Sequence, residues 1–250
     1  MSGPPQPRRR GSYGIDAPYA FGAITALSLA YVVIAIISAI DSGRVWLFVP
    51  ALFLLTILAF VLHTTLRGKF LVWAELLDKL GLRGDERILD LGCGRGAVLL
   101  LAAQRLTTGR AVGVDFWRGV DQSGKSAEAT RSNSVAEGVA DRVELHTGDM
   151  TALPFEDNSF DVVVSSLAIH NISGRAGREK AVDEAVRVLR PGGRLLIADI
   201  RGTRQHQEQL AKLGMSDVTR SRLGWRFWWG GPWAATRLVT ATKPASATPE

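Results

Sequence analysis

Cysteine is almost absent from the sequence, whose 250 residues contain only Cys93. A single cysteine cannot form a disulfide within the chain, so a disulfide-stabilised framework is excluded. Zinc sites that need several thiolates, and chemistry that relays through several thiols, are excluded by the same count. Cys93 lies inside a glycine-rich stretch, and we interpret it as a small side chain that fits a tight turn rather than as a nucleophile.

The basic residues do not form a nucleic-acid-binding pattern. The net charge is +6, but the arginines and lysines are scattered or flank apolar segments. The sequence contains no motif of a DNA- or RNA-binding module. We therefore expect no nucleic-acid partner, and we also expect no metal site.

Formal charge is missing from two long stretches near the N-terminus. Ala17 to Ile40 and Val45 to Leu66 are 24 and 22 residues long, and four turn residues, Asp41 to Arg44, join them. About 20 apolar residues cross a bilayer core, so residues 17–66 predict two transmembrane helices in a hairpin. A signal peptide is a poorer match, because its apolar region has only about 7–15 residues. One such run could be a buried core helix, but two in succession favour the membrane.

Basic residues flank the two spans on one side: Arg8, Arg9 and Arg10 precede the first, and Arg67 and Lys69 follow the second. By the positive-inside rule, both ends of the hairpin face the cytoplasm. The expected location is therefore the cytoplasmic membrane, with the rest of the chain on the cytoplasmic side. Small residues at every fourth position, Gly22, Ala26 and Ala30, predict the face on which the two helices pack.

The remaining segments follow from composition and periodicity. Residues 1–16 are rich in proline, arginine and glycine and predict a disordered basic tail. Residues 67–83 predict an amphipathic connecting helix, residues 84–243 a folded domain, and residues 244–250 a second disordered tail. Strands and helices alternate through the domain, which is typical of a parallel sheet with helices on both faces.

A glycine-rich stretch, ILDLGCGRG at residues 88–96, lies at the start of this domain. A short apolar strand, three glycines at alternate positions and a helical run from Ala97 form a nucleotide-binding arrangement, because glycine allows positive φ and close approach of a ligand. The glycines alone do not determine which ligand binds, since Gly92, Gly94 and Ala97 also fit the dinucleotide-binding fingerprint.

The segments that follow narrow the choice of ligand. A second buried strand ends in Asp115, 23 residues after Gly92, and GDMTALPF, FDVVV and LRPGGRLLI follow at residues 148–155, 160–164 and 189–197. From about Arg83 to Lys243 this series resembles class I S-adenosylmethionine-dependent methyltransferases, of the type 11-like branch that includes quinone-biosynthesis enzymes. The resemblance implies an α/β, Rossmann-like fold with a seven-stranded, mostly parallel sheet. Its last strand is antiparallel, and no helix is expected between strands near 216–223 and 234–242.

The resemblance also implies a set of site residues. The cofactor S-adenosylmethionine is expected on Asp90, Gly92, Gly94, Gly96, Asp115, Phe116, Asp149, Met150 and Ser165. Asp115 matches the ribose ligand, Asp149 with the Met150 backbone matches the adenine contact, and Phe116 or Trp117 is expected to lie against adenine or simply to pack. His170 is the candidate general base for the acceptor, with packing or capping as its alternative, and Asp199 is a second candidate on the same edge.

Tryptophan is concentrated between Gly224 and Trp233, where four of the seven tryptophans fall. This segment joins the last two strands at the active-site edge. Three interpretations stay open: a loop that enters the lipid headgroups, an apolar wall for the acceptor, and an aromatic cluster that folds the hairpin.

The expected function is a membrane-anchored methyltransferase that moves a methyl group from S-adenosylmethionine to a small, apolar or lipid-like acceptor, with membrane lipid as its other partner. The alternatives are a catalytically silent cofactor-binding sensor or assembly protein, and a protein methyltransferase that acts on a membrane neighbour. Ser165 to Ala168 stands where amide-methylating relatives carry Asn-Pro-Pro-Tyr, which disfavours methylation of an amide or exocyclic amine.

Overall fold

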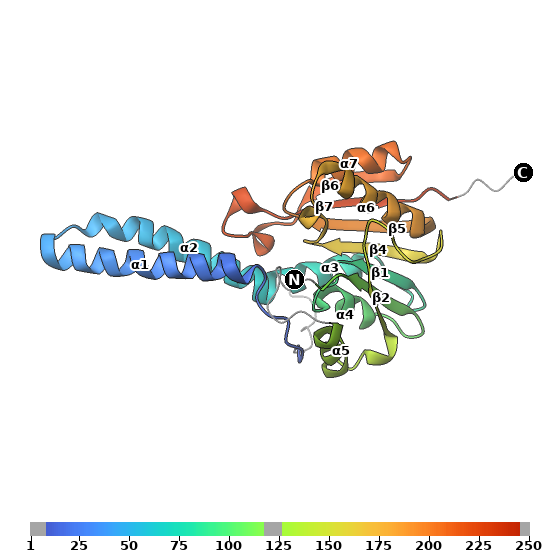
Figure 1. Cartoon of the computed structure of the whole chain (residues 1–250), viewed down its shortest axis with the longest axis horizontal. Coiled ribbons are helices and arrows are strands. Elements are labelled where there is room, and N and C mark those ends of the chain that lie inside the picture. Colours follow the sequence, from blue (N-terminus) through green and yellow to red (C-terminus); the bar gives the residue numbers. More distant parts are fainter. Residues whose placement is uncertain (1–8, 118–126, 246–250) are drawn as a thin grey trace, which may run out of the picture.

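The computed structural model describes residues 9–117 and 127–245. It shows an α/β domain from which two long helices project as a hairpin (Figure 1). Residues 1–8 of the expected N-terminal tail, residues 118–126, and residues 246–250 of the expected C-terminal tail lie outside the described residues. Residues 118–126 include the start of a helix that the sequence predicts over 123–138.

A single seven-stranded sheet forms the centre of the domain, in the order β3-β2-β1-β4-β5-β7-β6. Its strands are β1 (Arg87–Leu91), β2 (Arg110–Asp115), β3 (Val143–Thr147), β4 (Phe160–Ser166), β5 (Leu189–Asp199), β6 (Ser216–Arg222) and β7 (Arg237–Thr242). β1 to β5 are parallel, and β7 lies antiparallel between β5 and β6. The reversed last strand is as expected, because no crossover helix separates β6 from β7.

Helices cover both faces of this sheet (Figure 1). One face is covered by α3 (Lys69–Lys79) and α4 (Ala97–Ala103). The other face is covered by α6 (Arg175–Val188), and α7 (Thr203–Lys212) adjoins α6. The remaining helix, α5 (Ala127–Ala136), precedes β3. Alternate residues of one strand serve the two cores: Ile88 belongs to the cluster around Trp73, and Leu89 to the cluster around Ala181. The central strands are therefore buried on both sides, which explains their continuous apolar runs.

The hairpin consists of α1 (Pro18–Ser42) and α2 (Phe48–His63), with a turn at Gly43, whose φ is 67°. α2 does not end at the domain. It continues through a π-helical turn, η2 (Thr64–Gly68), into α3, so that Val45–Lys79 is one helix of 35 residues. The connecting helix expected over 67–83 is thus the continuation of the second apolar helix, and no flexible linker separates hairpin from domain.

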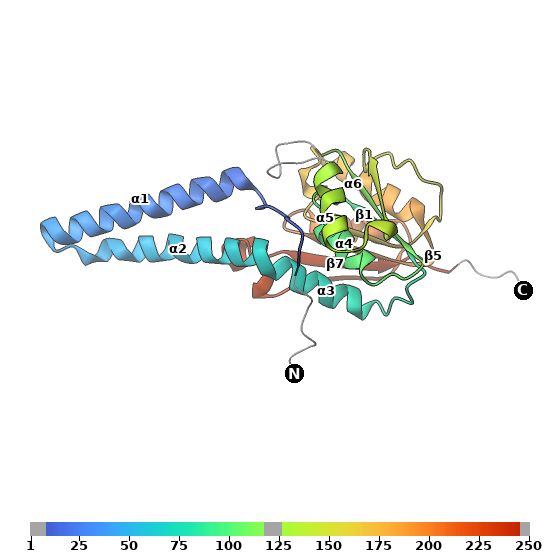
Figure 2. The same cartoon turned by 90° about the horizontal axis from the view of Figure 1, so that it is seen from below.

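The two hairpin helices bury little of their surface. In α1 only Ser28 and Ala35 are buried, and in α2 only Ala51 and Val61. The predicted packing face is wrong: Gly22, Ala26 and Ala30 are exposed. Ser28 and Ala35 lie seven residues apart and share a different face of α1. The two helices lie closest at their connected end and diverge toward the domain (Figure 2). Both α1 and the helix that contains α2 are long and apolar enough to cross a bilayer.

Residues 9–16, which we call the N-terminal strap, differ from the disordered tail expected there. The Gly11 amide and the Tyr13 hydroxyl donate to Glu137 Oε1 of the turn after α5, at 2.8 and 3.0 Å. Asp16 forms a 2.5 Å ion pair with the buried Lys69 and accepts a hydrogen bond from Thr65. The strap therefore joins α5 to the helix that leads out of the hairpin.

Candidate active site

The glycine loop (residues 92–96) follows β1 at the carboxyl edge of the sheet. Gly92, Gly94 and Gly96 have φ values of 74°, 53° and 85°, a region that favours glycine. A Cβ on Gly92 would lie 2.2 Å from the Cβ of Ala168. The loop after β4 is therefore packed directly against the glycine loop, and only glycine fits at position 92.

Asp115, the last residue of β2, closes the glycine loop from the side. Its carboxylate accepts hydrogen bonds from the Gly94 amide at 2.8 Å and from the Trp117 amide at 2.6 Å. The Trp117 indole donates to the Gly94 carbonyl at 3.1 Å, so this ring is fixed over the loop. Phe116 is 41% exposed. A carboxylate can accept about four hydrogen bonds, so Asp115 keeps acceptor capacity for ribose hydroxyls.

The other expected cofactor ligands lie around this loop in different ways. The Met150 methyl group is 3.4 Å from the position of a Cβ on Gly92, so it reaches the loop. The Asp149 carboxylate caps its own turn by accepting from the Thr151 amide at 2.8 Å. Ser165 is buried and donates to the Leu91 carbonyl at 3.0 Å, which ties β4 to β1 beneath the loop.

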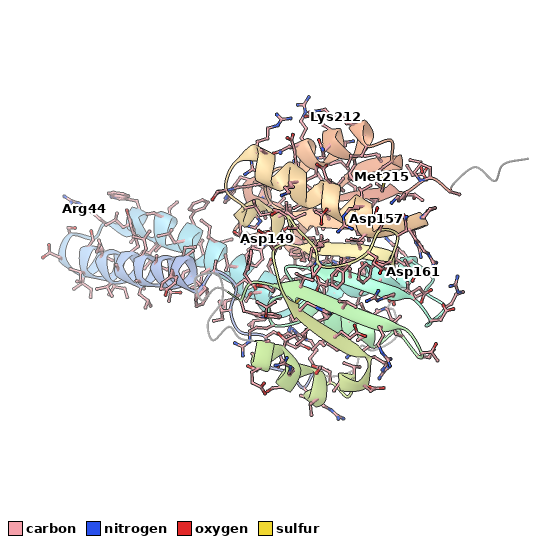
Figure 3. All side chains as sticks on the ribbon, turned by 45° about the vertical axis from the view of Figure 1, so that its right-hand side comes forward. Arg44, Asp149, Asp157, Asp161, Lys212 and Met215 are labelled. Atoms are coloured by element: carbon pink, nitrogen blue, oxygen red, sulfur yellow. The ribbon has the colours of Figure 1, made fainter. Side chains whose placement is uncertain are left out.

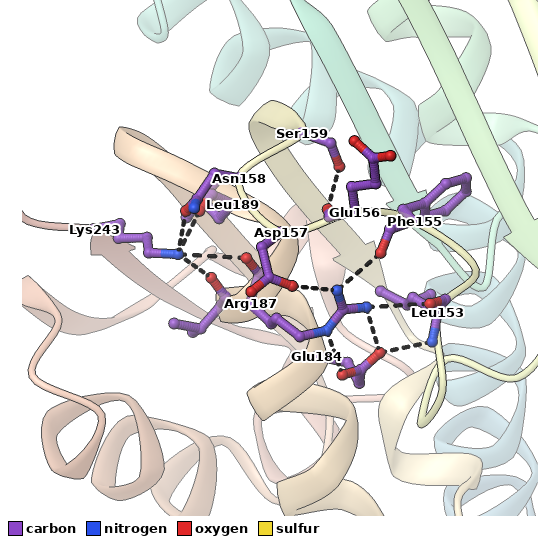
Figure 4. A network of polar contacts seen from close by, with 11 residues as sticks. Leu153, Phe155, Glu156, Asp157, Asn158, Ser159, Glu184, Arg187, Leu189 and Lys243 are labelled. Atoms are coloured by element: carbon purple, nitrogen blue, oxygen red, sulfur yellow. Dashed lines mark hydrogen bonds and ion pairs between the residues drawn. The ribbon is translucent and has the colours of Figure 1, made fainter.

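The loop that carries Asp149 is held at its other end by Arg187 of α6 (Figure 4). Arg187 donates to the Leu153 and Phe155 carbonyls and pairs with Glu184, while Glu184 accepts from the Leu153 amide. The Arg187 hydrogen bond holds the pKa of Glu184 below its usual value. Figure 3 shows Asp149 on the side of the domain that faces the hairpin, with Asp157 and Asp161 on the opposite side. The carboxyl edge of the sheet thus faces the hairpin.

Asp90 lies behind the glycine loop and is fully buried. Burial raises its pKa to about 7, and the nearby charge of Asp115 acts in the same direction, whereas a hydrogen bond from the Leu99 backbone amide opposes the shift. Asp90 therefore supports the first turn of α4 from below.

The stability of the full-length protein is expected to fall as pH rises from about 4 to about 7, and Asp90→Asn is expected to flatten this decline. The unfolded state releases this proton near the ordinary Asp pKa of about 3.9, and the folded state only near 7, so the folded state binds more protons between these values. The expected difference is a few kcal/mol, at about 1.4 kcal/mol per pKa unit. Urea unfolding across this range measures it, and Asp41→Asn, at an exposed position in the last turn of α1, is the matched control. An identical pH dependence in Asp90→Asn and the wild type contradicts the prediction.

His170 and Asp199 come together at the ends of β4 and β5. His170 Nδ1 lies 2.6 Å from Asp199 Oδ1, a close contact that does not have the geometry of an aligned hydrogen bond, and the His170 amide donates to Asp199 Oδ2 at 3.1 Å. The side chains are 17% and 1% exposed. Leu167, three residues earlier, has a φ of 57°, an uncommon conformation that turns the chain back over the carboxyl edge. The two residues expected separately from the sequence thus form one pair.

His206, in α7, is a residue that the sequence analysis missed. It is fully buried, and within the described part of the chain neither ring nitrogen has a hydrogen-bond partner. Burial lowers its pKa, although Asp199 opposes the shift, so the ring is neutral near pH 7. The sequence could have indicated it, because His206 lies in the first turn of the helix that follows β5, close to the edge of the sheet that carries Asp199. Trp73, also missed, donates to the Ser166 hydroxyl at 2.8 Å and joins α3 to the end of β4.

The sheet order, the reversed last strand and the glycine loop closed by an acid at the end of β2 define the class. This class is the fold of the class I S-adenosylmethionine-dependent methyltransferases.

Comparison with known proteins finds similarity over the central part of the chain. Residues 89–197 match the family described as "Methyltransferase domain". The ubiquinone/menaquinone biosynthesis C-methyltransferase UbiE of Roseobacter denitrificans is 35% identical over 129 residues, which cover 51% of this chain and 48% of that protein. The methyltransferase GfsG of Streptomyces halstedii is 37% identical over 131 residues, which cover 52% and 44%. The chain thus spans about half the length of the curated relatives it matches.

Among solved structures, the [4+2]-cyclase SpnF is similar with a TM-score of 0.56 and 22% identity, covering 69% of this chain and 81% of that one. At this identity the likeness shows the fold alone. Since SpnF is described as a cyclase, the fold does not by itself fix the reaction.

Proposed function

We propose that the full chain transfers a methyl group from S-adenosylmethionine to a small apolar acceptor of the quinone type, at the cytoplasmic face of a membrane into which α1 and α2 insert. The observation that carries the proposal is the glycine loop closed by Asp115, which lies within the segment that matches the methyltransferase family. The relative UbiE supports the acceptor class, because its name gives quinone biosynthesis.

The residues of this chain would have three tasks. Gly92, Gly94 and Gly96 leave room for the cofactor against the backbone, Asp115 takes the ribose hydroxyls, and Asp149 with Met150 takes the adenine side. The bound sulfonium supplies an activated methyl group, so the protein mainly aligns the two reactants and excludes water. His170, oriented by Asp199, would take the proton that the acceptor loses.

The exposed apolar residues of the hairpin support membrane insertion. They include Leu29, Ile37 and Ile40 of α1 and Val49, Leu52 and Phe53 of α2, a surface that water would solvate poorly. Arginines before α1 and after α2 favour the orientation in which the domain lies in the cytoplasm, the compartment where S-adenosylmethionine is made.

Membrane vesicles of known orientation test the proposal. Vesicles with the cytoplasmic face outward, prepared from cells that express the full chain and given methyl-labelled S-adenosylmethionine, are expected to incorporate label into lipid-extractable quinone. Sealed vesicles of the opposite orientation are expected to incorporate none until they are permeabilised. Binding of S-adenosylmethionine without label in any extract would favour the silent sensor, and label on protein would favour a protein methyltransferase.

A further inference from the structure

The tryptophan-rich connection between β6 and β7 lies along α2. Its central part, residues 227–236, which we call the finger, carries no charged residue, and Arg226 and Arg237 flank it. In Figure 1 this segment projects from the domain beside the hairpin. The contacts of the finger show how far it extends.

The contacts advance along the helix in regular order. The Trp225 ring, at the base, stacks on His63 with ring centroids 4.9 Å apart, and the Trp228 ring contacts Phe60 at 5.6 Å. A Cβ on Gly230 would lie 3.0 Å from Ile57, and the Trp233 ring lies 6.0 Å from Phe53. From His63 to Phe53 is about 15 Å at 1.5 Å per residue. The connection from Trp225 to Trp233 therefore accompanies the second apolar helix for nearly three turns, and the finger itself for about two.

The base of the finger is fixed to the helix. Arg226 makes two hydrogen bonds to the Glu75 carboxylate of α3, at 2.5 and 2.7 Å. A Cβ on Gly68 would lie 1.7 Å from the Arg226 carbonyl oxygen, so only glycine permits this approach. The Thr64 hydroxyl donates to the Trp228 carbonyl at 2.6 Å. The finger cannot leave α2 without breaking these contacts.

Many of the polar groups of the finger are paired within it or with α2. The Trp229 amide donates to the Ala234 carbonyl, the Ala234 amide to Gly231, and the Thr236 amide to Phe227. The Trp229 indole donates to the Thr236 hydroxyl at 3.2 Å. A non-helical backbone is tolerated at membrane depth only when such groups are satisfied by protein. In contrast, the Trp225 and Trp233 side chains are 54% and 67% exposed.

We propose that the finger inserts, together with α2, into the acyl region of the cytoplasmic leaflet, and that the acceptor enters the active site from the lipid along it. Trp46, at the far end of the hairpin, lies 17 residues from His63, or about 25 Å, which compares with a hydrocarbon core of about 30 Å. Trp46 and Trp225 thus lie near opposite interfaces, with Trp233 between them. The entry route rests on the proposed methyl transfer, whereas insertion of the finger rests only on the proposed anchoring of the hairpin.

The register of the sheet connects the finger to the site. β6 runs parallel to β5, because both are antiparallel to β7, and Arg237 pairs with Asp199 on one side and Arg222 on the other. The finger therefore leaves the same edge that carries Asp199 and His170. An acceptor dissolved in the lipid would reach this edge without crossing water.

Fluorescence quenching of the full chain in nanodiscs of acyl-brominated phosphatidylcholine with phosphatidylglycerol tests the insertion. Bromine on the acyl chains quenches the emission of tryptophans inside the bilayer. Trp233→Phe and Trp46→Phe are each expected to remove part of the quenched tryptophan emission. Trp117→Phe is expected to remove part of the unquenched emission. If Trp46→Phe lowers the quenched share and Trp233→Phe does not, the finger lies outside the bilayer and the inference is overturned. If neither lowers it, the hairpin and the finger are both outside, which overturns the proposed anchoring as well.

Trp233→Asp tests the entry route, because a charge in the hydrocarbon is strongly unfavourable. Methylation of demethylmenaquinone held in the nanodisc is expected to fall roughly tenfold or more, while calorimetric affinity for S-adenosylmethionine and methylation of a tail-less naphthoquinone in solution are retained. An equal loss on both acceptors overturns the lipid route. A wild-type protein that methylates neither acceptor overturns the proposed function, and the quenching result then still decides the position of the finger.

Discussion

Replacing Asp115 with alanine is expected to weaken S-adenosylmethionine binding roughly ten- to hundredfold. The side chain contributes twice: it accepts from the Gly94 and Trp117 amides, which shapes the glycine loop, and its remaining acceptor sites are those assigned to the ribose. Alanine leaves both amides and the ribose hydroxyls without this partner. Calorimetry on the full-length protein measures the change.

A second acid of the same domain provides the matched control for Asp115. Asp141 pairs with Arg142 far from the glycine loop and is mostly exposed, so Asp141→Ala is expected to leave the affinity unchanged. Thermal unfolding without cofactor shows whether a variant binds less cofactor because it is less stable. Surface substitutions such as Asp141→Ala change the free energy of unfolding by only about 0.5 kcal/mol. Wild-type affinity in Asp115→Ala would overturn the assignment of this strand end.

Turnover is expected to fall by about 10² to 10⁴ in His170→Gln, with cofactor affinity nearly unchanged. The reason is that a neutral imidazole can accept the acceptor proton, whereas the amide of glutamine cannot. Single-turnover measurement with saturating cofactor isolates this step. His146→Gln, which changes a histidine of β3 packed on Phe155, is the control and is expected to keep wild-type turnover.

Asp199→Asn is expected to lower turnover less than His170→Gln does, and the double variant is expected to be no slower than His170→Gln alone. Asp199 acts through the ring that it orients at 2.6 Å, so removing it has no further effect once the imidazole is gone. Additive losses would show that the two side chains act independently. Full turnover in His170→Gln would mean that this histidine packs or caps and that the reaction needs no base from it.

The sequence by itself determined the layered fold. Apolar runs such as Val112 to Val114 can only be strands buried on both faces, and alternation with helices makes those strands parallel. The absence of a helix between Arg222 and Arg237 predicted the antiparallel end of the sheet, which the structure confirms. The glycine loop could be placed because positive φ at alternate positions is a local requirement that glycine meets.

What the sequence could not determine was which residues meet across the fold. His170 lies in the short turn after β4 and Asp199 ends β5, 29 residues further on, and only the pairing of β4 with β5 brings them together. Composition predicted disorder for residues 9–16, but their order depends on Glu137 and Asn133, which lie more than a hundred residues away. Local pattern carries no information on partners at such distances.

The hairpin shows the same limit most clearly. The sequence predicted a transmembrane helix up to residue 66 and a separate connecting helix over 67–83, yet Lys69 is buried beside Asp16 and one helix continues to Lys79. The small residues at Gly22, Ala26 and Ala30 predicted a packing face, but they are exposed, and the buried residues of α1 are Ser28 and Ala35, on another face of the helix. The length of an apolar run predicts a helix because it is a property of the local sequence. Which face of that helix packs depends on where the folded domain holds the other helix.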